Sequence, residues 1–259
     1  MSTESRSCAV GERSVEMMNM NGHVGPHELF SGVQSIEAGD GIVALADDGL
    51  RWSGIPGARA ALSLGFGEHW QEVSVPVNDG SDEEQLLDDF VHGSPKLSPI
   101  AAEKLVERMI ASQVTVHGVA NPSGTGLAGE LQSLLAPTEF GADITDPHEP
   151  SRIMRLIQTF RRELVYEIPD RALERRAQAD KRDKKAPLPT RPASDRDMYK
   201  FYPMGHGHLI ISPEPEAVVA EAEALGQRAK HIGSITTHRV LTIVSRGMNQ
   251  RDTILEYEL

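Results

Sequence analysis

Two glycine-containing loops, residues 47–54 and 121–126, carry the residue types best suited to hold an anionic ligand. Each loop follows an apolar run and precedes a helical pattern. Its backbone N–H groups should therefore be exposed beside a helix N-terminus, where anionic groups bind. The first loop also contributes one cation. The predicted substrate- or phosphate-binding residues are Arg51, Ser53, Ser123, Gly124, Thr125 and Gly126.

Three further residues are candidates for acid–base catalysis. Glu12 and Glu16 are four residues apart, a spacing that places two carboxylates on one face of a helix. They could act as a base or contact Mg²⁺, or they could form an ordinary solvated face. His117 stands just before the second loop and could orient a substrate or act as an acid near neutral pH. The alternative is a hydrogen-bonded histidine at a strand end.

Three other groups have a weaker claim to chemistry. Asp47 and Asp48 could bind a cation or could simply terminate the preceding strand. His206 and His208 alternate, so on a strand they share a face, but two ligands without a third make no metal site and none is predicted. Cys8 is the one cysteine, so no disulfide can form within the chain, and we expect a cytoplasmic protein.

The composition indicates a folded protein with an aliphatic core. Of 259 residues, 39% are hydrophobic, 25% are charged and 5% are aromatic. The net charge of −12 argues against a broad nucleic-acid or anionic-membrane surface, but it leaves room for a local anion site. No apolar run approaches about 18 residues, the length of a membrane-spanning helix. From the charge and the run lengths together, we expect neither a nucleic acid nor a membrane as partner.

Apolar periodicity predicts several strands and helices from residue 42 onward. Short apolar segments predict strands at 42–46, 114–119, 208–212, 231–236, 240–245 and 253–259. Spacings of three and four residues predict helices at 55–64, 99–112, 127–135, 151–164 and 213–226. This order predicts an α+β (layered α/β) fold in which helices pack on a mixed sheet. We expect one domain over 39–259, preceded by an irregular segment over 1–38.

A basic, proline-rich insertion at about 170–195 interrupts this predicted domain. Residues 171–185 hold seven basic and three acidic side chains, and three prolines follow by residue 192. Such a composition disfavours a packed core. The segment could clamp phosphates or RNA, or it could form a solvated loop.

Four segments, in order along the chain, resemble the C-terminal half of aminoimidazole ribonucleotide synthase, or phosphoribosylformylglycinamidine cyclo-ligase. Residues 39–54 are similar to that family's GD-apolar-GL-x-SSGLHSNG element, and residues 116–127 are similar to its HxTGGGL loop. Residues 198–208 resemble its MYxxFNMGxGM segment, and residues 213–236 resemble its last helix and the strand after it. A fainter match of residues 8–17 to GGETAEM would place them near the end of the family's N-terminal domain.

The resemblance implies an ATP-dependent cyclisation in purine-type metabolism, acting on a phosphorylated small molecule. It implies catalytic roles for Glu12, Glu16 and His117 and substrate contacts in the two loops. The family's Asp-rich elements for ATP and magnesium have no counterpart in this sequence, so ATP and Mg²⁺ are expected through a separate N-terminal-half partner. A homo-oligomer is the other expected assembly, because a domain that normally leans on a neighbour exposes an apolar face.

Several departures from the family pattern keep other functions open. The family's Ser-Ser-Gly is Asp47-Asp48-Gly49 here, and two carboxylates repel a phosphate. The family's triple glycine is Gly124-Thr125-Gly126. One alternative is therefore a non-catalytic ligand-binding or assembly subunit that kept the fold. Another is an enzyme with a different substrate, because thiamine monophosphate kinase, selenophosphate synthetase and the hydrogenase-maturation carbamoyl dehydratase resemble the same architecture.

Overall fold

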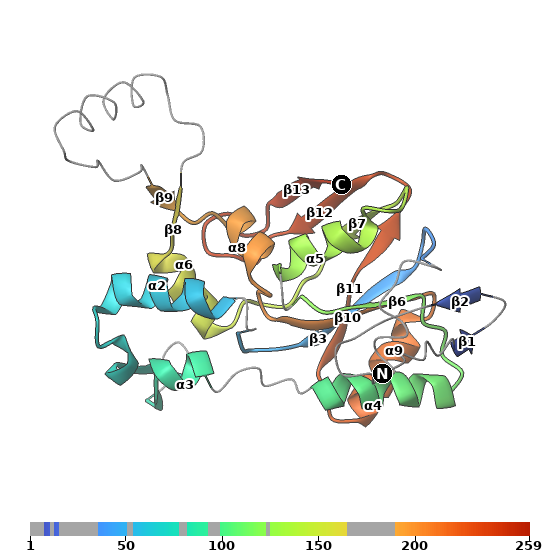
Figure 1. Ribbon diagram of the computed structural model, residues 1–259, viewed down its shortest axis with the longest axis horizontal. Coiled ribbons are helices and arrows are strands. Elements are labelled where there is room, and N and C mark those ends of the chain that lie inside the picture. The colour runs from blue at the N-terminus through green and yellow to red at the C-terminus, as the bar shows by residue number, and fades with distance from the viewer. Residues whose placement is uncertain are drawn as a thin grey trace, which may run out of the picture.

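The computed structural model describes residues 8–10, 13–15, 36–50, 54–77, 82–92, 99–122, 125–164 and 190–259. Their central feature is a seven-stranded sheet (Figure 1). In spatial order the strands are β13 (Ile254–Glu258), β12 (Val240–Val244), β7 (Gly141–Ile144), β11 (Ala229–Thr236), β3 (Gly41–Ala46), β10 (His206–Ser212) and β6 (Gly118–Ala120). β12 and β7 run parallel, and the other neighbours in this sheet are antiparallel. The predicted α+β fold with a mixed sheet is confirmed.

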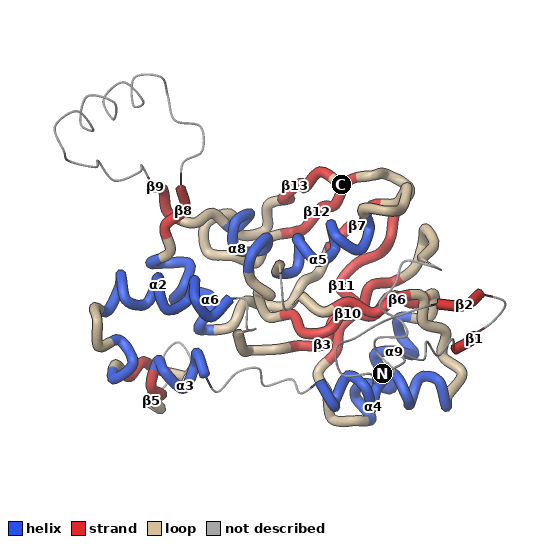
Figure 2. The backbone as a smooth tube through the Cα atoms, in the orientation of Figure 1, coloured by secondary structure: helices blue, strands red, loops and turns tan. Residues whose placement is uncertain are grey.

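Helices cover both faces of this sheet, which is why β3, one of its inner strands, is apolar throughout. The described helices are α2 (Ile55–Phe66), α3 (Leu87–His92), α4 (Pro99–Ala111), α5 (Gly126–Leu135), α6 (Arg152–Phe160), α8 (Asp195–Phe201) and α9 (Pro215–Ala224). Val43 and Leu45 of β3 pack in one hydrophobic cluster with α4 and α9. Ile42 and Ala44 belong to the larger cluster on the other face, which includes α5, α8, α6 and α2. Figure 2 shows helices on both sides of the strands.

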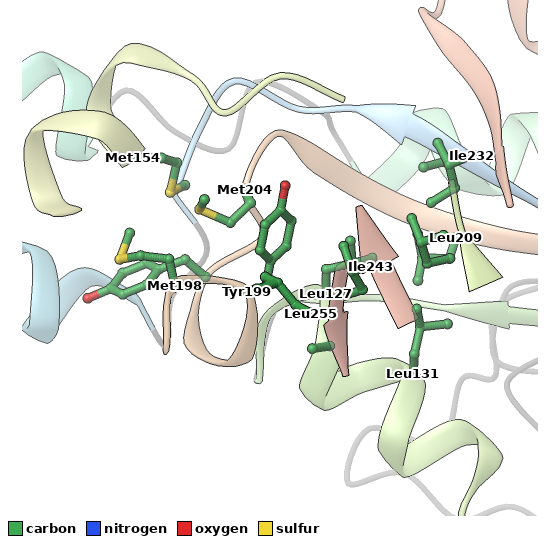
Figure 3. Close-up of a cluster of buried hydrophobic side chains, with 14 of the residues drawn as sticks. Leu127, Leu131, Met154, Met198, Tyr199, Met204, Leu209, Ile232, Ile243 and Leu255 are labelled. Carbon is green, nitrogen blue, oxygen red and sulfur yellow. The ribbon is translucent and has the colours of Figure 1, made fainter. Parts of the chain in front are cut away.

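The larger cluster is drawn close up in Figure 3, where Tyr199 of α8 lies beside Met204 and near Leu127 of α5. The expected aliphatic core is thus supplemented by aromatic rings, since Tyr199, Tyr202 and Tyr257 are almost fully buried. Within the part of the chain that the structure describes, no helix has the length and hydropathy needed to cross a bilayer.

At one end of the sheet, α2 and α6 pack together near α3 (Figure 1). Phe66 of α2 and Phe160 of α6 meet edge to face, with their ring centroids 5.1 Å apart. The short elements that link this region are η2 (Trp70–Glu72), β4 (Ser74–Pro76) and β5 (Glu84–Leu86). The packing fixes the direction in which α6 points its N-terminus.

The predicted helix over 151–164 is too long, because α6 ends at Phe160. The next residues form β8 (Arg162–Leu164), which pairs antiparallel with β9 (Thr190–Pro192). This two-stranded stem brackets residues 165–189, so strand pairing overrides the helical periodicity that extends to Leu164. β9 and the start of α8 occupy the end of the predicted insertion at 170–195, and the rest of that insertion lies outside the described residues.

Several other elements also differ from those predicted. β7 was not predicted, because its four residues, Gly-Ala-Asp-Ile, carry little apolar periodicity and are held by strands on both sides. α8 was not predicted either, although Ser194 and Asp197 form a capping box at its N-terminus. β6 is shorter than the predicted strand at 114–119. Within residues 1–38, expected to be irregular, β1 (Cys8–Val10) and β2 (Arg13–Val15) pair antiparallel.

Candidate anion-binding site

A hollow of about 790 Å³ lies at the edge of the sheet where β3, β7 and β12 end and β10 and β11 begin. Five cations line it, contributed by α6 and by the ends of β11 and β12. These cations are Arg152, Arg155, Arg228, Lys230 and Arg246. Three carboxylates share the wall, those of Asp48, Asp146 and Glu149. The lining therefore carries a surplus of two positive charges on a chain whose net charge is −12.

Carboxylates at the rim are shared between cations. Asp146 lies 2.6 Å from Lys230 Nζ and 3.4 Å from an Arg246 nitrogen. The hydrogen bond from Lys230 holds the pKa of the Asp146 carboxyl below its usual range, so this carboxylate is charged at neutral pH. Asp48 pairs with Arg228 at 2.6 Å. Sharing of this kind leaves the cations with capacity for a further anion.

Glu149 is shared in the same way. It accepts two hydrogen bonds from Arg251, at 2.6 and 3.0 Å, and its carboxylate lies 3.7 Å from Arg155. The hydrogen bonds from Arg251 lower the pKa of the Glu149 carboxyl. About half of the Glu149 side chain is exposed, so this carboxylate sits at the mouth of the hollow rather than inside it.

The N-terminus of α6 opens on the hollow. Pro150, Ser151, Arg152 and Ile153 all line it, and the first turn of α6 has no acidic residue. Ser151 is the N-cap residue, yet its side chain makes no capping hydrogen bond. Its Oγ is buried and finds no hydrogen-bond partner among the described residues. A nine-residue helix that presents its N-terminus and a buried hydroxyl to a cationic hollow favours an anionic ligand.

A buried carboxylate fixes the loop that carries Arg246. Asp195, fully buried at the start of α8, accepts hydrogen bonds from Ser245 Oγ at 2.6 Å and from the backbone N–H of Gln250 at 2.8 Å. Its other oxygen accepts from Gln158 Nε2 and from the N–H of Asn249. The four bonds satisfy a charge that burial would otherwise make costly.

The same loop is held at two more points. The Tyr199 hydroxyl accepts a hydrogen bond from the N–H of Arg246 at 3.0 Å. Gly247 lies so close to Asp195 that a Cβ on it would be 2.3 Å from the carboxyl carbon. Asp195 and Tyr199 therefore act as positioning residues for the Arg246 guanidinium.

Two histidines beside the hollow are uncharged at neutral pH. Burial lowers the pKa of His206 to about 3, and burial followed by the charges of Lys230 and Arg228 lowers the pKa of His148. His206 Nδ1 lies 2.8 Å from the Pro203 carbonyl, and Nε2 accepts from the N–H of His148. Both ring nitrogens of His206 are thus engaged with other groups of the chain.

The predicted anion-loop residues that the structure describes lie at the same edge of the sheet as the hollow but do not line it. Thr125 precedes α5, and its Oγ1 is 3.4 Å from the Glu130 carboxylate. Gly126 has a φ of +69°, and a Cβ there would be 2.5 Å from the backbone N of Tyr202. Gly126 is therefore required for the packing of α5 on α8, whatever it binds.

The structure places the predicted catalytic residue His117 at the opposite edge of the sheet. Its ring Nδ1 lies 2.8 Å from an Asp40 carboxylate oxygen, and its backbone N–H donates to the Ile211 carbonyl oxygen. His117 cannot contact a ligand in the hollow, and a catalytic role elsewhere stays a prediction. Six predicted site residues lie outside the described residues: Glu12, Glu16, Arg51, Ser53, Ser123 and Gly124.

Asp47 and Asp48 take different roles in the first loop. Asp47 is buried, and its Oδ1 accepts from the N–H of Gly49 at 2.9 Å, which shapes the turn after β3. Asp48 instead reaches the wall of the hollow. Within the described residues, the first loop thus contributes the Asp48 carboxylate to the cationic site.

The profile of AIR synthase related protein, C-terminal domain, matches residues 37–245. The chain belongs to this family. The matched residues of the AIR synthase-related domain run from before β3 to the end of β12 and include four of the five cations of the hollow. A comparison with curated protein sequences gives no significant match.

Solved structures similar to this AIR synthase-related chain come from Thermotoga maritima. PurL complexed with FGAR has 14% identity, covers 88% of this chain and 28% of PurL, and gives a TM-score of 0.39. PurLQS has 11% identity, with 88% and 26% covered and a TM-score of 0.42. Phosphoribosylformylglycinamidine synthase II has 11% identity, with 87% and 26% covered and a TM-score of 0.37. The chain spans 26–28% of the length of these proteins.

Proposed function

We propose that this chain binds a phosphorylated small molecule in the cationic hollow, as the substrate-side half of an AIR synthase-related enzyme of purine-type metabolism. The observation that carries the proposal is the surplus of two positive charges in this hollow of a strongly acidic chain. A phosphate monoester carries roughly −1.5 to −2 charges near neutral pH, so its charge matches that surplus. A broad cationic surface for a polymer would instead require a basic chain.

Three kinds of group in the hollow would hold the phosphate. The guanidinium groups of Arg152, Arg155 and Arg246 offer paired N–H donors that fit two phosphate oxygens. The N-terminus of α6 adds backbone N–H groups and the positive end of the helix dipole. The Ser151 hydroxyl adds one more hydrogen bond, which gives this buried group the partner it lacks among the described residues.

On this proposal the reaction is an ATP-dependent ring closure, and the hollow orients the substrate by its phosphate. ATP and Mg²⁺ would be bound by a separate nucleotide-binding half, in line with the resemblance described above. Phosphoryl transfer depends on metal-neutralised phosphates and positioned donors, so the two halves would have to meet at the substrate. Assembly with that half, or as a homo-oligomer, is part of the same proposal.

A second candidate is a non-catalytic subunit that binds the same class of ligand. The observation that favours it is the pair Asp47 and Asp48, which stands where the resembled family has serines. Asp48 lines the hollow and neutralises Arg228 at 2.6 Å. A carboxylate in this place weakens phosphate binding without preventing it.

Calorimetric titration with ribose 5-phosphate tests the proposed site. Lys230→Met and Arg246→Gln should each weaken binding about tenfold, because each removes a charge that faces the ligand. Arg239→Gln is the matched control, since Arg239 is exposed in the turn between β11 and β12, at the opposite edge of the sheet. Unchanged affinity in both hollow variants would overturn the proposed function.

Titration with ATP and Mg²⁺ separates the two candidates. It is made on the purified chain, alone and together with a candidate nucleotide-binding half. Binding of ATP only in the mixture, with product formation, would support the enzyme. Binding of ribose 5-phosphate without any effect of that half would support the non-catalytic subunit.

A further inference from the structure

We propose that a second hollow beside the first binds a second anionic group, so that the ligand of this chain carries two of them, such as two phosphates or a phosphate and a carboxylate. The inference rests on the proposed function and specifies its ligand. The second hollow has a volume of about 360 Å³. Its lining residues are Arg152, Arg155, Leu156, Thr159, Arg246, Gly247, Met248 and Arg251.

The charged residues that line the second hollow are all positive, unlike those of the first. It holds four arginines, and none of these lining residues, all of which the structure describes, is an aspartate or glutamate. Four guanidinium groups around one small space repel one another unless an anion lies between them. An anionic group bound in this hollow would therefore reduce the repulsion.

The two hollows share a wall. Arg152, Arg155 and Arg246 line both of them, so one planar guanidinium can face a group on either side. Arg246 is held in this position by the bonds of its loop to Asp195 and Tyr199, and about a quarter of its side chain is exposed. A ligand whose two anionic groups lie on the two sides of this wall would engage all three shared arginines.

The carboxylates that now balance these arginines lie at the rim. Glu149, Asp146 and Asp252 pair with them, and each of these side chains is about half exposed or more. Ion pairs of exposed side chains are weak, so a ligand anion can replace them at small cost. Leu156 and exposed Met248 add an apolar surface for the carbon skeleton between the two groups.

A series of alkane-α,ω-bisphosphonates tests this inference directly, with methylphosphonate as the single-group probe. We expect the affinity of the best bisphosphonate to be at least about tenfold higher than that of methylphosphonate, because its second group binds at a high effective concentration. Affinity should pass through a maximum with chain length, since only one length spans the shared wall.

Variants assign the gain to the second hollow. Met248→Asp places a carboxylate there and should lower bisphosphonate affinity more than methylphosphonate affinity, so that the gain is reduced, and Arg251→Gln should reduce the same gain. Arg228→Gln, which touches only the first hollow, should weaken both kinds of probe, and Arg239→Gln should weaken neither.

The possible failures are distinct. Equal affinity for methylphosphonate and every bisphosphonate, with both lowered by Arg228→Gln, would overturn the second subsite but keep the proposed function. Equal losses for the two kinds of probe in Met248→Asp would overturn it too. Absence of binding by any phosphonate would overturn both proposals.

Discussion

Replacing Asp195 by Asn should destabilise the protein by about 3 kcal/mol, because hydrogen bonds to a buried charge are worth roughly 1.5–3 kcal/mol each and an orphaned donor costs about as much. Each carboxylate oxygen of Asp195 accepts one side-chain and one backbone hydrogen bond. An amide nitrogen at either position turns an acceptor into a donor that faces a backbone N–H. If it replaces Oδ2, the Ser245 hydroxyl can rotate to accept from it, but the N–H of Gln250 cannot adapt.

Urea unfolding followed by circular dichroism at pH 7 measures this loss. The matched control is Asp82→Asn, the same chemical change at an exposed side chain, and it should shift stability by less than about 0.5 kcal/mol. The variant should also bind ribose 5-phosphate more weakly, since Asp195 holds the loop of Arg246. A loss of less than about 1 kcal/mol would show that this carboxylate does not anchor the loop.

Three further outcomes follow from the geometry. Gly126→Ala should cost about 2–4 kcal/mol because the new Cβ would be 2.5 Å from the Tyr202 backbone, whereas Gly226→Ala, also at positive φ but in open space, should cost only about 1 kcal/mol in the same urea assay. The pKa of His206 is about 3 in the folded chain and near 6.5 in the unfolded one, so its neutral form stabilises the fold above about pH 6.5. Between these values only the unfolded chain takes up the proton, so stability falls with falling pH, and His206→Gln should make the slope shallower by about 1.4 kcal/mol per pH unit. An equal slope in both proteins would contradict the assigned pKa. Raising the salt concentration should weaken ribose 5-phosphate binding in calorimetry, because screening acts on the surplus charge of the hollow, and salt-independent affinity would argue for an uncharged contact.

Much of the fold could be predicted from local pattern alone. β3 is an apolar run because both of its faces are buried. α5 and α9 show helical periodicity because each packs against the rest of the protein along one stripe. α6 was predicted past its end because the apolar stripe continues to Leu164, and only the pairing of β8 with β9 stops it. β7 could not be predicted because its stability comes from neighbours about 90 and 100 residues away along the chain.

The cationic hollow could not be predicted in the same way. Arg228 and Lys230 lie at the start of one strand, Arg246 follows another, and Arg152 begins a helix. Each is unremarkable in sequence, and they meet only because β12, β7, β11 and β3 are neighbours in this order. The sequence does show a cation at the end of several predicted elements. The order of the strands in the sheet, which places those ends at one edge, cannot be predicted from these local patterns. The described residues of the two loops predicted as anion sites do lie at that edge.

The pairing of β8 with β9 in a two-stranded stem allows the segment between them to vary in length without affecting the main sheet. Leu164 and Thr190 face each other across the last rung of that stem, so whatever lies between them starts and finishes at neighbouring points on the surface. Doubling the number of residues in such a closed segment costs only about 0.6 kcal/mol in chain entropy, and no strand of the main sheet has to change register. In relatives of this chain, residues 165–189 can therefore change in length or in charge and make new contacts. The sheet and the three arginines that line both hollows need not change.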